Sequence, residues 1–173
     1  FAMPDVPGPE TLPTEDEFRK SYVDRLPERM RAQHLRDRPI EQREIDPPDE
    51  IDPSPRPPFK HTWIRANGAL PDDPRLHQCL LAYASDMSLM DTAVQPHGIS
   101  WMSGKMMGAS LDHAMWFHHP LRIDDWLLYA HDAPVSAGGR GFNRGLIYTR
   151  AGQLVASVVQ EGLMRPVKPK AAG

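Results

Sequence analysis

The chain has 173 residues, of which 25% are charged and 40% hydrophobic, and its formal net charge is −3. This length suits one domain with an appendage, and the small negative charge gives no indication of a nucleic-acid or anionic-membrane partner. The sequence contains no apolar run of the roughly 18 residues that would span a bilayer.

Proline dominates the first third of the chain, with twelve of the nineteen prolines before residue 59. We interpret residues 1–13 as a proline-rich interdomain linker, and the start without an initiator Met leads us to expect a further segment before it. Residues 14–58 are interpreted as a helix and a proline-rich lead-in. Thr14 and Glu17 have the spacing of a capping box, and the helix should break or bend near Pro27.

A domain with regular patterns is expected over residues 59–167, with a C-terminal tail over residues 168–173. "PIEQREI" before it is a candidate edge strand, while residues 46–58 hold too many prolines for regular structure. Alternation over "FKHTWIRA" indicates a strand that ends at the turn signal Asn67-Gly68.

A helix is predicted over roughly residues 74 to 90, with Asp73 as its N-cap and Pro74 as its first residue. Further strand-like runs follow at residues 108–119, 126–137, 140–150 and 154–165. A strand, a long helix and an antiparallel meander, in that order, predict an α+β hotdog fold, in which a sheet of about five or six strands wraps around a central helix.

One face of this helix is apolar when successive residues are placed about 100° apart. Cys79, Tyr83 and Met87 lie on that face, which we expect to be buried, with Cys79 as a small buried hydrophobe. A single cysteine also indicates a reducing cytosol as the compartment. Asp86 lies on the rim of this face, where a carboxylate either bonds to a neighbouring backbone group or serves a function.

Several extended motifs follow one another over nearly the whole chain: "MPDVPGPETLP", "PDDPRLHQCLLAYASDMSLM", "QPHG", "SLDHAMWFHHP", "WLLYAHD" and "GRGFNRGLIYTRAGQLVASVVQEGLMR". Together they closely resemble acyl-CoA thioesterase II, the TesB-like thioesterases. Members of that family are double hotdogs that hydrolyse acyl-CoA thioesters to the free acid and CoA. The resemblance implies that this chain is the linker and the second hotdog, half of a double hotdog. Its partner would be a first hotdog of the same polypeptide or a second copy, in an oligomer.

The resemblance also implies a catalytic set. The family's helix Asp falls on Asp86, its strand hydroxyl on Ser110, where Thr is commoner, and its Gln on Gln160. Such a set suits thioester hydrolysis, because Asp86 can take a proton from a water that Ser110 and Gln160 hold in the attacking position. It needs no covalent nucleophile, cofactor or metal.

Three alternatives to this interpretation remain open. A metal site on His113, His118 and His119 is disfavoured because adjacent strand residues point to opposite faces. An acyl-thioester dehydratase would need a His/Asp pair, and His113 has the opposite strand parity to Ser110. A non-catalytic half that binds acyl-CoA or only its partner domain is the third.

The methionines and several cationic side chains are not assigned a definite role. Six of the nine methionines fall between Met87 and Met115 and either fill the core or line an adaptable acyl tunnel. Some cationic side chains could meet the CoA phosphates, but none is assigned individually: Lys105, Arg140, Arg144 and Arg165.

Overall fold

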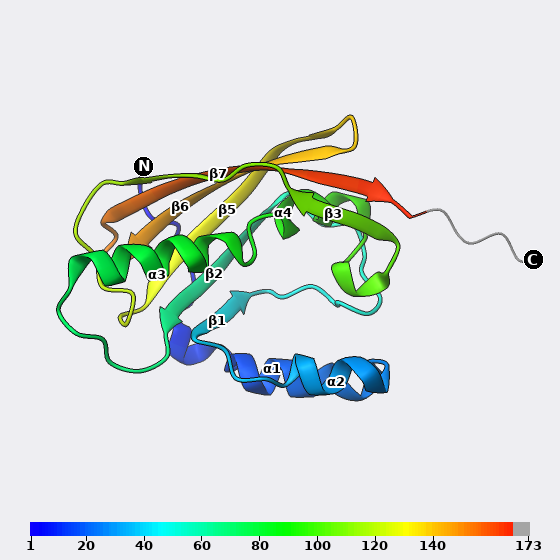
Figure 1. The fold of residues 1–173 in the computed structure, drawn as a ribbon, viewed down its shortest axis with the longest axis horizontal. Coiled ribbons are helices and arrows are strands. Elements are labelled where there is room, and N and C mark those ends of the chain that lie inside the picture. Colours follow the sequence, from blue (N-terminus) through cyan, green and yellow to red (C-terminus); the bar gives the residue numbers. More distant parts are fainter. Residues whose placement is uncertain (168–173) are drawn as a thin grey trace, which may run out of the picture.

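The computed structural model describes residues 1–167; the tail expected at residues 168–173 lies outside the described part. Its main feature is a seven-stranded antiparallel sheet in the order β1-β2-β5-β6-β7-β3, with β4 also paired to β7 (Figure 1). The strands are β1 (Ile40–Ile45), β2 (Phe59–Ala66), β3 (Met106–Ser110), β4 (Ala114–Phe117), β5 (Leu127–Ala137), β6 (Arg140–Thr149) and β7 (Leu154–Pro166). The prediction of an α+β hotdog fold is confirmed.

The sheet has more strands than the expected five or six for two reasons. The edge strand predicted from "PIEQREI" pairs with β2 as part of the same sheet, with Ile40 opposite Ala66. The run predicted as one strand over residues 108–119 is divided into β3 and β4, and both pair with β7.

The central helix α3 (Pro74–Asp86) lies across one face of the sheet and has the predicted start, because the Asp73 side chain accepts a hydrogen bond from the Arg75 N–H. It ends at Asp86, four residues before the predicted end, and the short helix α4 (Asp91–Val94) follows. Asp86 therefore stands at a helix terminus.

The apolar face expected to be buried is not the face of α3 that packs on the sheet. His77, Leu81, Ala84 and Ser85 are the buried residues of α3, whereas Cys79 is exposed and Tyr83 is 54% exposed. The prediction that Cys79 is a buried hydrophobe is wrong. Helical periodicity detects an apolar face, but it does not tell which structure covers that face.

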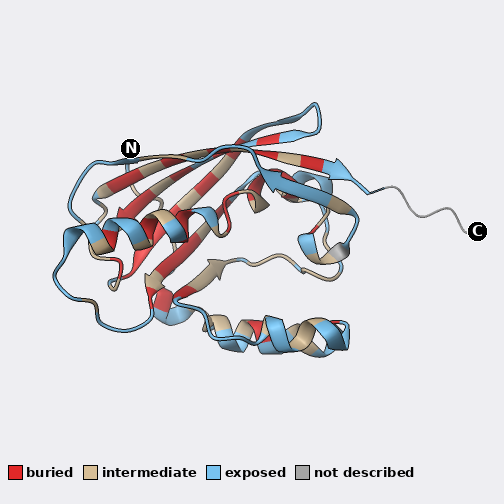
Figure 2. Cartoon of the chain, viewed as in Figure 1, coloured by how far each residue is buried: buried red, intermediate tan, exposed pale blue. Residues whose placement is uncertain are grey.

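Two helices precede the sheet, α1 (Glu15–Tyr22) and α2 (Glu28–His34), separated at Pro27 as predicted. The capping box between Thr14 and Glu17 is present. Both helices lie beside β1 at the bottom of Figure 1, and their surfaces are mostly exposed, whereas buried residues run along the central strands (Figure 2). Short 3₁₀ turns occur at Pro9–Thr11, Val23–Arg25, Gln95–His97 and Trp101–Ser103.

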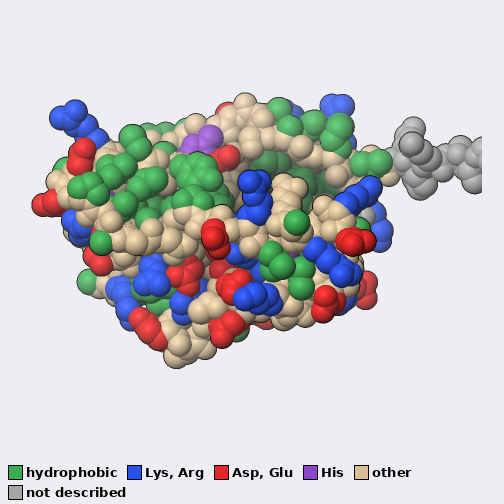
Figure 3. All heavy atoms as spheres, turned by 60° about the horizontal axis from the view of Figure 1, so that its bottom comes forward, with side chains coloured by type: hydrophobic (Ala, Val, Ile, Leu, Met, Phe, Trp, Pro, Cys, Tyr) green, Lys and Arg blue, Asp and Glu red, His purple; other side chains and the backbone are tan. Residues whose placement is uncertain are grey.

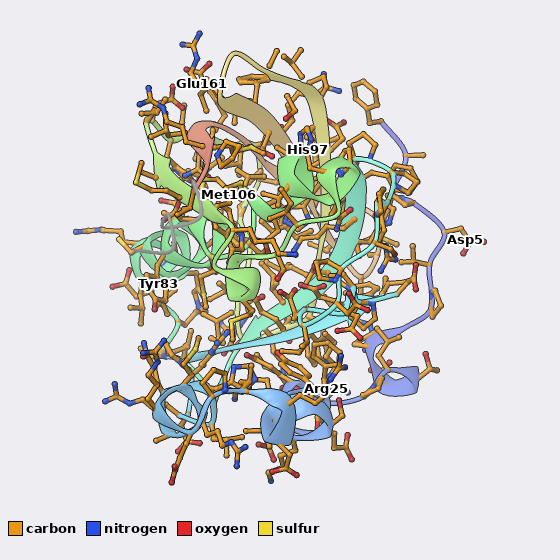
Figure 4. All side chains as sticks on the ribbon, turned by 90° about the vertical axis from the view of Figure 1, so that its right-hand side faces the viewer. Asp5, Arg25, Tyr83, His97, Met106 and Glu161 are labelled. Carbon is orange, nitrogen blue, oxygen red and sulfur yellow. The ribbon has the colours of Figure 1, made fainter. Side chains whose placement is uncertain are left out.

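The N-terminal segment packs against the face of the sheet opposite α3. Trp63, Trp126, Leu128 and Tyr148 form a cluster there, covered by Met3, Val6 and Leu12. The Trp63 indole N–H donates to the Pro7 carbonyl at 2.8 Å. Figure 4 shows Asp5 of this segment and Tyr83 of α3 on opposite sides of the molecule. The segment thus covers a large apolar surface.

No helix in residues 1–167 is both long and apolar enough to cross a membrane.

Candidate active site

Asp86 and Gln160 are hydrogen-bonded although they come from different elements. Asp86 is the exposed last residue of α3, and Gln160 lies in β7 with 0% of its surface exposed. The Gln160 Nε2 donates to Asp86 Oδ1. The other side-chain atom, Gln160 Oε1, is buried and has no hydrogen-bond partner in the described part of the chain. A vacant acceptor therefore lies next to an exposed carboxylate.

Ser110 ends β3 and lies opposite Gly162 of β7. Its hydroxyl is 3.5 Å from the sulfur of Met90. A Cβ at residue 162 would lie 2.6 Å from Met90 Sδ, so the Met90 side chain occupies space that only a glycine leaves free. Gly162 thereby allows Met90 to lie against the Ser110 hydroxyl.

The three residues of the expected catalytic set line one open depression of about 470 Å³. Its complete lining is Ala82, Tyr83, Asp86, Met87, Ser110, Leu111, Asp112, His113 and Gln160. Within residues 1–167, Ser110 has no direct hydrogen bond to Asp86 or Gln160. The depression brings together a carboxylate, an amide and a hydroxyl from α3, β7 and β3, and their catalytic roles stay predictions.

The chain between β3 and β4 does not follow strand geometry. The Leu111 N–H donates to the Glu161 carbonyl at 2.9 Å, and Asp112 Oδ1 accepts from the Glu161 N–H at 2.7 Å. His113 lines the same depression as Ser110, and its Nε2 is 3.0 Å from Ser85 Oγ. The parity argument that placed His113 away from Ser110 is wrong, because Leu111, Asp112 and His113 lie outside the strands.

Tyr129 of β5 contacts the C-terminal end of α3. Its hydroxyl donates to the Ser85 carbonyl at 2.9 Å, next to Asp86. Burial, with a smaller contribution from the Asp86 charge, raises the pKa of Tyr129 well above its usual value, so the hydroxyl keeps its proton. Gly145 of β6 leaves room for this ring, since a Cβ there would lie 2.9 Å from the hydroxyl oxygen.

Some of the other candidate residues already have partners. Arg144 makes two hydrogen bonds to Asp132, both of 2.8 Å, and Arg140 lies 3.4 Å from Glu161. His118 Nε2 is 2.9 Å from Ser157 Oγ. Within residues 1–167, no group of three or more His, Cys, Asp or Glu side chains could hold a metal ion.

The sequence analysis did not predict a buried charge cluster that lies near α4. Lys60 Nζ lies 3.1 Å from Glu44 Oε1 and 2.9 Å from Asp91 Oδ2. Burial alone would lower the pKa of Lys60, but the charges of Asp91 and Glu44 raise it. Nearby, burial and the same two carboxylates raise the pKa of Glu50 to about 7. A single Lys in an alternating strand carries no signal of such a cluster.

Comparison with known proteins identifies a family. The acyl-CoA thioesterase family model matches residues 55–163. The chain is 35% identical to acyl-CoA thioesterase 2 of Haemophilus influenzae over 94% of this chain and 57% of that protein. It is 36% identical to mouse acyl-coenzyme A thioesterase 8 over 98% of this chain and 54% of that protein.

Solved structures give a similar result. The crystal structure of the acyl-CoA thioesterase II TesB2 from Mycobacterium marinum matches with a TM-score of 0.69 and 33% identity, over 97% of this chain and 57% of that one. The chain thus spans about half the length of the relatives it matches.

Proposed function

The chain belongs to the acyl-CoA thioesterase family, and on this basis we propose that it hydrolyses acyl-CoA thioesters to free fatty acid and CoA. The observation that carries this proposal is the exposed Asp86 carboxylate held by the buried Gln160 amide. One oxygen of Asp86 is held by the Gln160 amide, and both side chains line the depression that Ser110 also lines.

In the proposed reaction, a water molecule donates a hydrogen bond to the exposed carboxylate of Asp86, which the Gln160 amide holds in place, while Ser110 helps to orient the water. As the water oxygen attacks the thioester carbonyl carbon, Asp86 takes the proton. The tetrahedral intermediate then expels the sulfur of CoA and leaves the free acid. Because Gln160 Nε2 is already bonded to Asp86, the carboxylate is oriented before the water binds.

The surroundings of the site favour direct attack by water over a covalent intermediate. Cys79, the single cysteine, is not among the residues that line the depression. Ser110 has a thioether neighbour and no hydrogen-bonded base in residues 1–167, so no group is placed to activate it as a nucleophile.

A thiol-release assay with palmitoyl-CoA tests this function directly. Hydration of an enoyl-CoA should be measured alongside, because His113 lines the depression together with Asp86, and a dehydratase uses such a pair. Release of CoA without hydration supports the thioesterase. Hydration alone would favour the dehydratase, and binding without either reaction would favour the non-catalytic half.

We also infer that the chain pairs with another hotdog domain along β3. This strand ends the main path of the sheet, and Met107 to Ser110 are exposed. Exposed apolar side chains lie on or near this edge: Tyr83, Met107, Leu111 and Trp116. Figure 3 shows hydrophobic side chains gathered over one part of the surface, next to a part rich in charged residues. An open strand edge with apolar neighbours is suited to a second sheet, either a first hotdog or a second copy.

A further inference from the structure

The proposed hydrolysis leaves one titratable side chain of the depression without a role, and that side chain is His113. We propose that His113 is a further catalytic residue, which donates a proton to the sulfur of CoA as the C–S bond breaks. This inference rests on the proposed thioesterase function and adds a second proton transfer to it.

The hydrogen bonds around Ser85 determine which nitrogen of His113 is available. Ser85 has one hydroxyl proton, and its Oγ donates to the Ala82 carbonyl at 2.9 Å. The same oxygen is 3.0 Å from His113 Nε2, and with its own proton directed to Ala82, or to Met115 Sδ at 3.8 Å, it can accept from an Nε2–H. Nδ1 has no hydrogen-bond partner in residues 1–167. It can gain and lose a proton while the bond to Ser85 persists.

Two hydrogen bonds attach the segment around His113 to the two elements that carry Asp86 and Gln160. On one side, Ser85 is the neighbour of Asp86 in α3, and it holds the imidazole. On the other side, Asp112 accepts from the Glu161 N–H, and Glu161 is the neighbour of Gln160 in β7. These two bonds attach the segment around His113 to the elements that carry Asp86 and Gln160, and the three side chains line the same depression.

The two proton transfers account for every atom in the reaction. Water adds to the carbonyl carbon, and one of its protons passes to the Asp86 carboxylate. When the intermediate collapses, the C–S electron pair moves to sulfur, and the sulfur takes the Nδ1 proton of the His113 imidazolium. The products are a carboxylic acid and the CoA thiol. Asp86 then loses its proton to solvent, and His113 gains one from solvent.

The experiment compares two leaving groups in the assembled, active protein. His113→Gln should lower kcat/KM for decanoyl-CoA by about 10²-fold, because an alkyl thiolate is a poorer leaving group than an aryl thiolate and leaves faster when a proton is transferred to it. With the decanoyl thioester of 4-nitrothiophenol, whose thiolate leaves unprotonated, the loss should be less than about threefold. His118→Gln is the matched control, since His118 contacts Ser157 and does not line the depression. It should retain wild-type rates.

A second measurement covers variants that fold poorly or react slowly with the aryl thioester. Across a series of decanoyl thioesters, the rate should depend weakly on the basicity of the leaving thiolate in the wild type and more steeply in His113→Gln. Ser85→Ala, which keeps His113 but removes its anchor, should reduce the rate on decanoyl-CoA more than that on the aryl thioester.

Equal losses on both thioesters, or an unchanged dependence on the leaving group in His113→Gln, would overturn the role of His113 while the thioesterase function stands. A wild-type protein without any thiol release would overturn both.

Discussion

The side-chain amide of Gln160 in β7 donates a hydrogen bond to the carboxylate of Asp86 at the end of α3, although 74 positions separate the two residues in sequence. This contact joins the central helix to the sheet at the site. It also orients the amide, so that its nitrogen faces the carboxylate and its oxygen is left without a partner among the described residues.

Asp86→Asn should lower kcat for palmitoyl-CoA by about 10²-fold or more, because the amide keeps the shape of the side chain but cannot take a proton. Thiol release gives the rate, and a thermal unfolding curve close to that of the wild type shows that the fold is kept. An Asp86→Asn protein with wild-type turnover would contradict the role of Asp86 as the base.

Gln160→Ala should reduce turnover in a folded protein with a lower melting temperature, since it removes a buried hydrogen bond to a charged group. Gln160→Glu is the sharper variant. It places a second carboxyl next to Asp86, and like charges at this distance force one carboxyl to titrate at a higher pH. The pH–rate profile of Gln160→Glu should therefore shift upward, and a profile that matches the wild type would show that residue 160 does not face the base.

Ser110→Thr should retain activity within a few-fold, because threonine keeps the hydroxyl and its added methyl restricts χ1. Ser110→Ala should lose more, since it removes the hydroxyl that we propose orients the water. Measuring kcat and KM for both variants separates orientation from binding. If Ser110→Ala were as active as Ser110→Thr, the hydroxyl would have no part in the reaction.

Glu50→Gln should stabilise the protein at about pH 8 and have little effect at about pH 5. The pKa of Glu50 is raised by burial and by Asp91 and Glu44 to about 7, whereas in the unfolded chain this carboxyl titrates near its ordinary value. Between these two values the folded state binds more protons than the unfolded state, so the contribution of Glu50 to stability falls as the pH rises.

Thermal unfolding at the two pH values checks this, with the exposed Glu28→Gln as a control for the added amide. The same stabilisation by Glu50→Gln at both pH values would disprove the linkage.

Met107→Lys should weaken association of the protein with its partner domain or second copy by about tenfold or more, because lysine on an edge strand opposes pairing. Met107 is 53% exposed on β3 and does not line the depression. Val135→Lys on β5 is a matched control, with an exposed fraction of 54%. Sedimentation velocity on both variants gives the comparison, and equal association would place the interface elsewhere.

Local signals in the sequence were sufficient for most elements of the fold. Asp73 and Pro74 mark the start of α3, and Thr14 with Glu17 marks the start of α1, because caps depend on residues a few positions apart. The residues of the candidate site came from the resemblance to a family, since no periodicity relates Asp86 to Gln160. Their contact depends on the packing of α3 on β7.

Two features required long-range structure and were predicted wrongly. Cys79 and Tyr83 lie on an apolar face of α3 that points away from the sheet, and the sequence alone does not tell which face the sheet covers. His113 reaches the site because Asp112 and Leu111 bond to Glu161 and interrupt the strand. Strict alternation cannot show such an interruption.

Gly162 has a consequence for how this site can change. A side chain at residue 162 would collide with Met90, and Met90 lies against the hydroxyl of Ser110. A larger residue at 162 would therefore displace the flexible end of the Met90 side chain from its place beside the Ser110 hydroxyl. A substitution at residue 162 thus reaches residue 110 through residue 90, so the effect of a change at 162 depends on which side chain stands at 90.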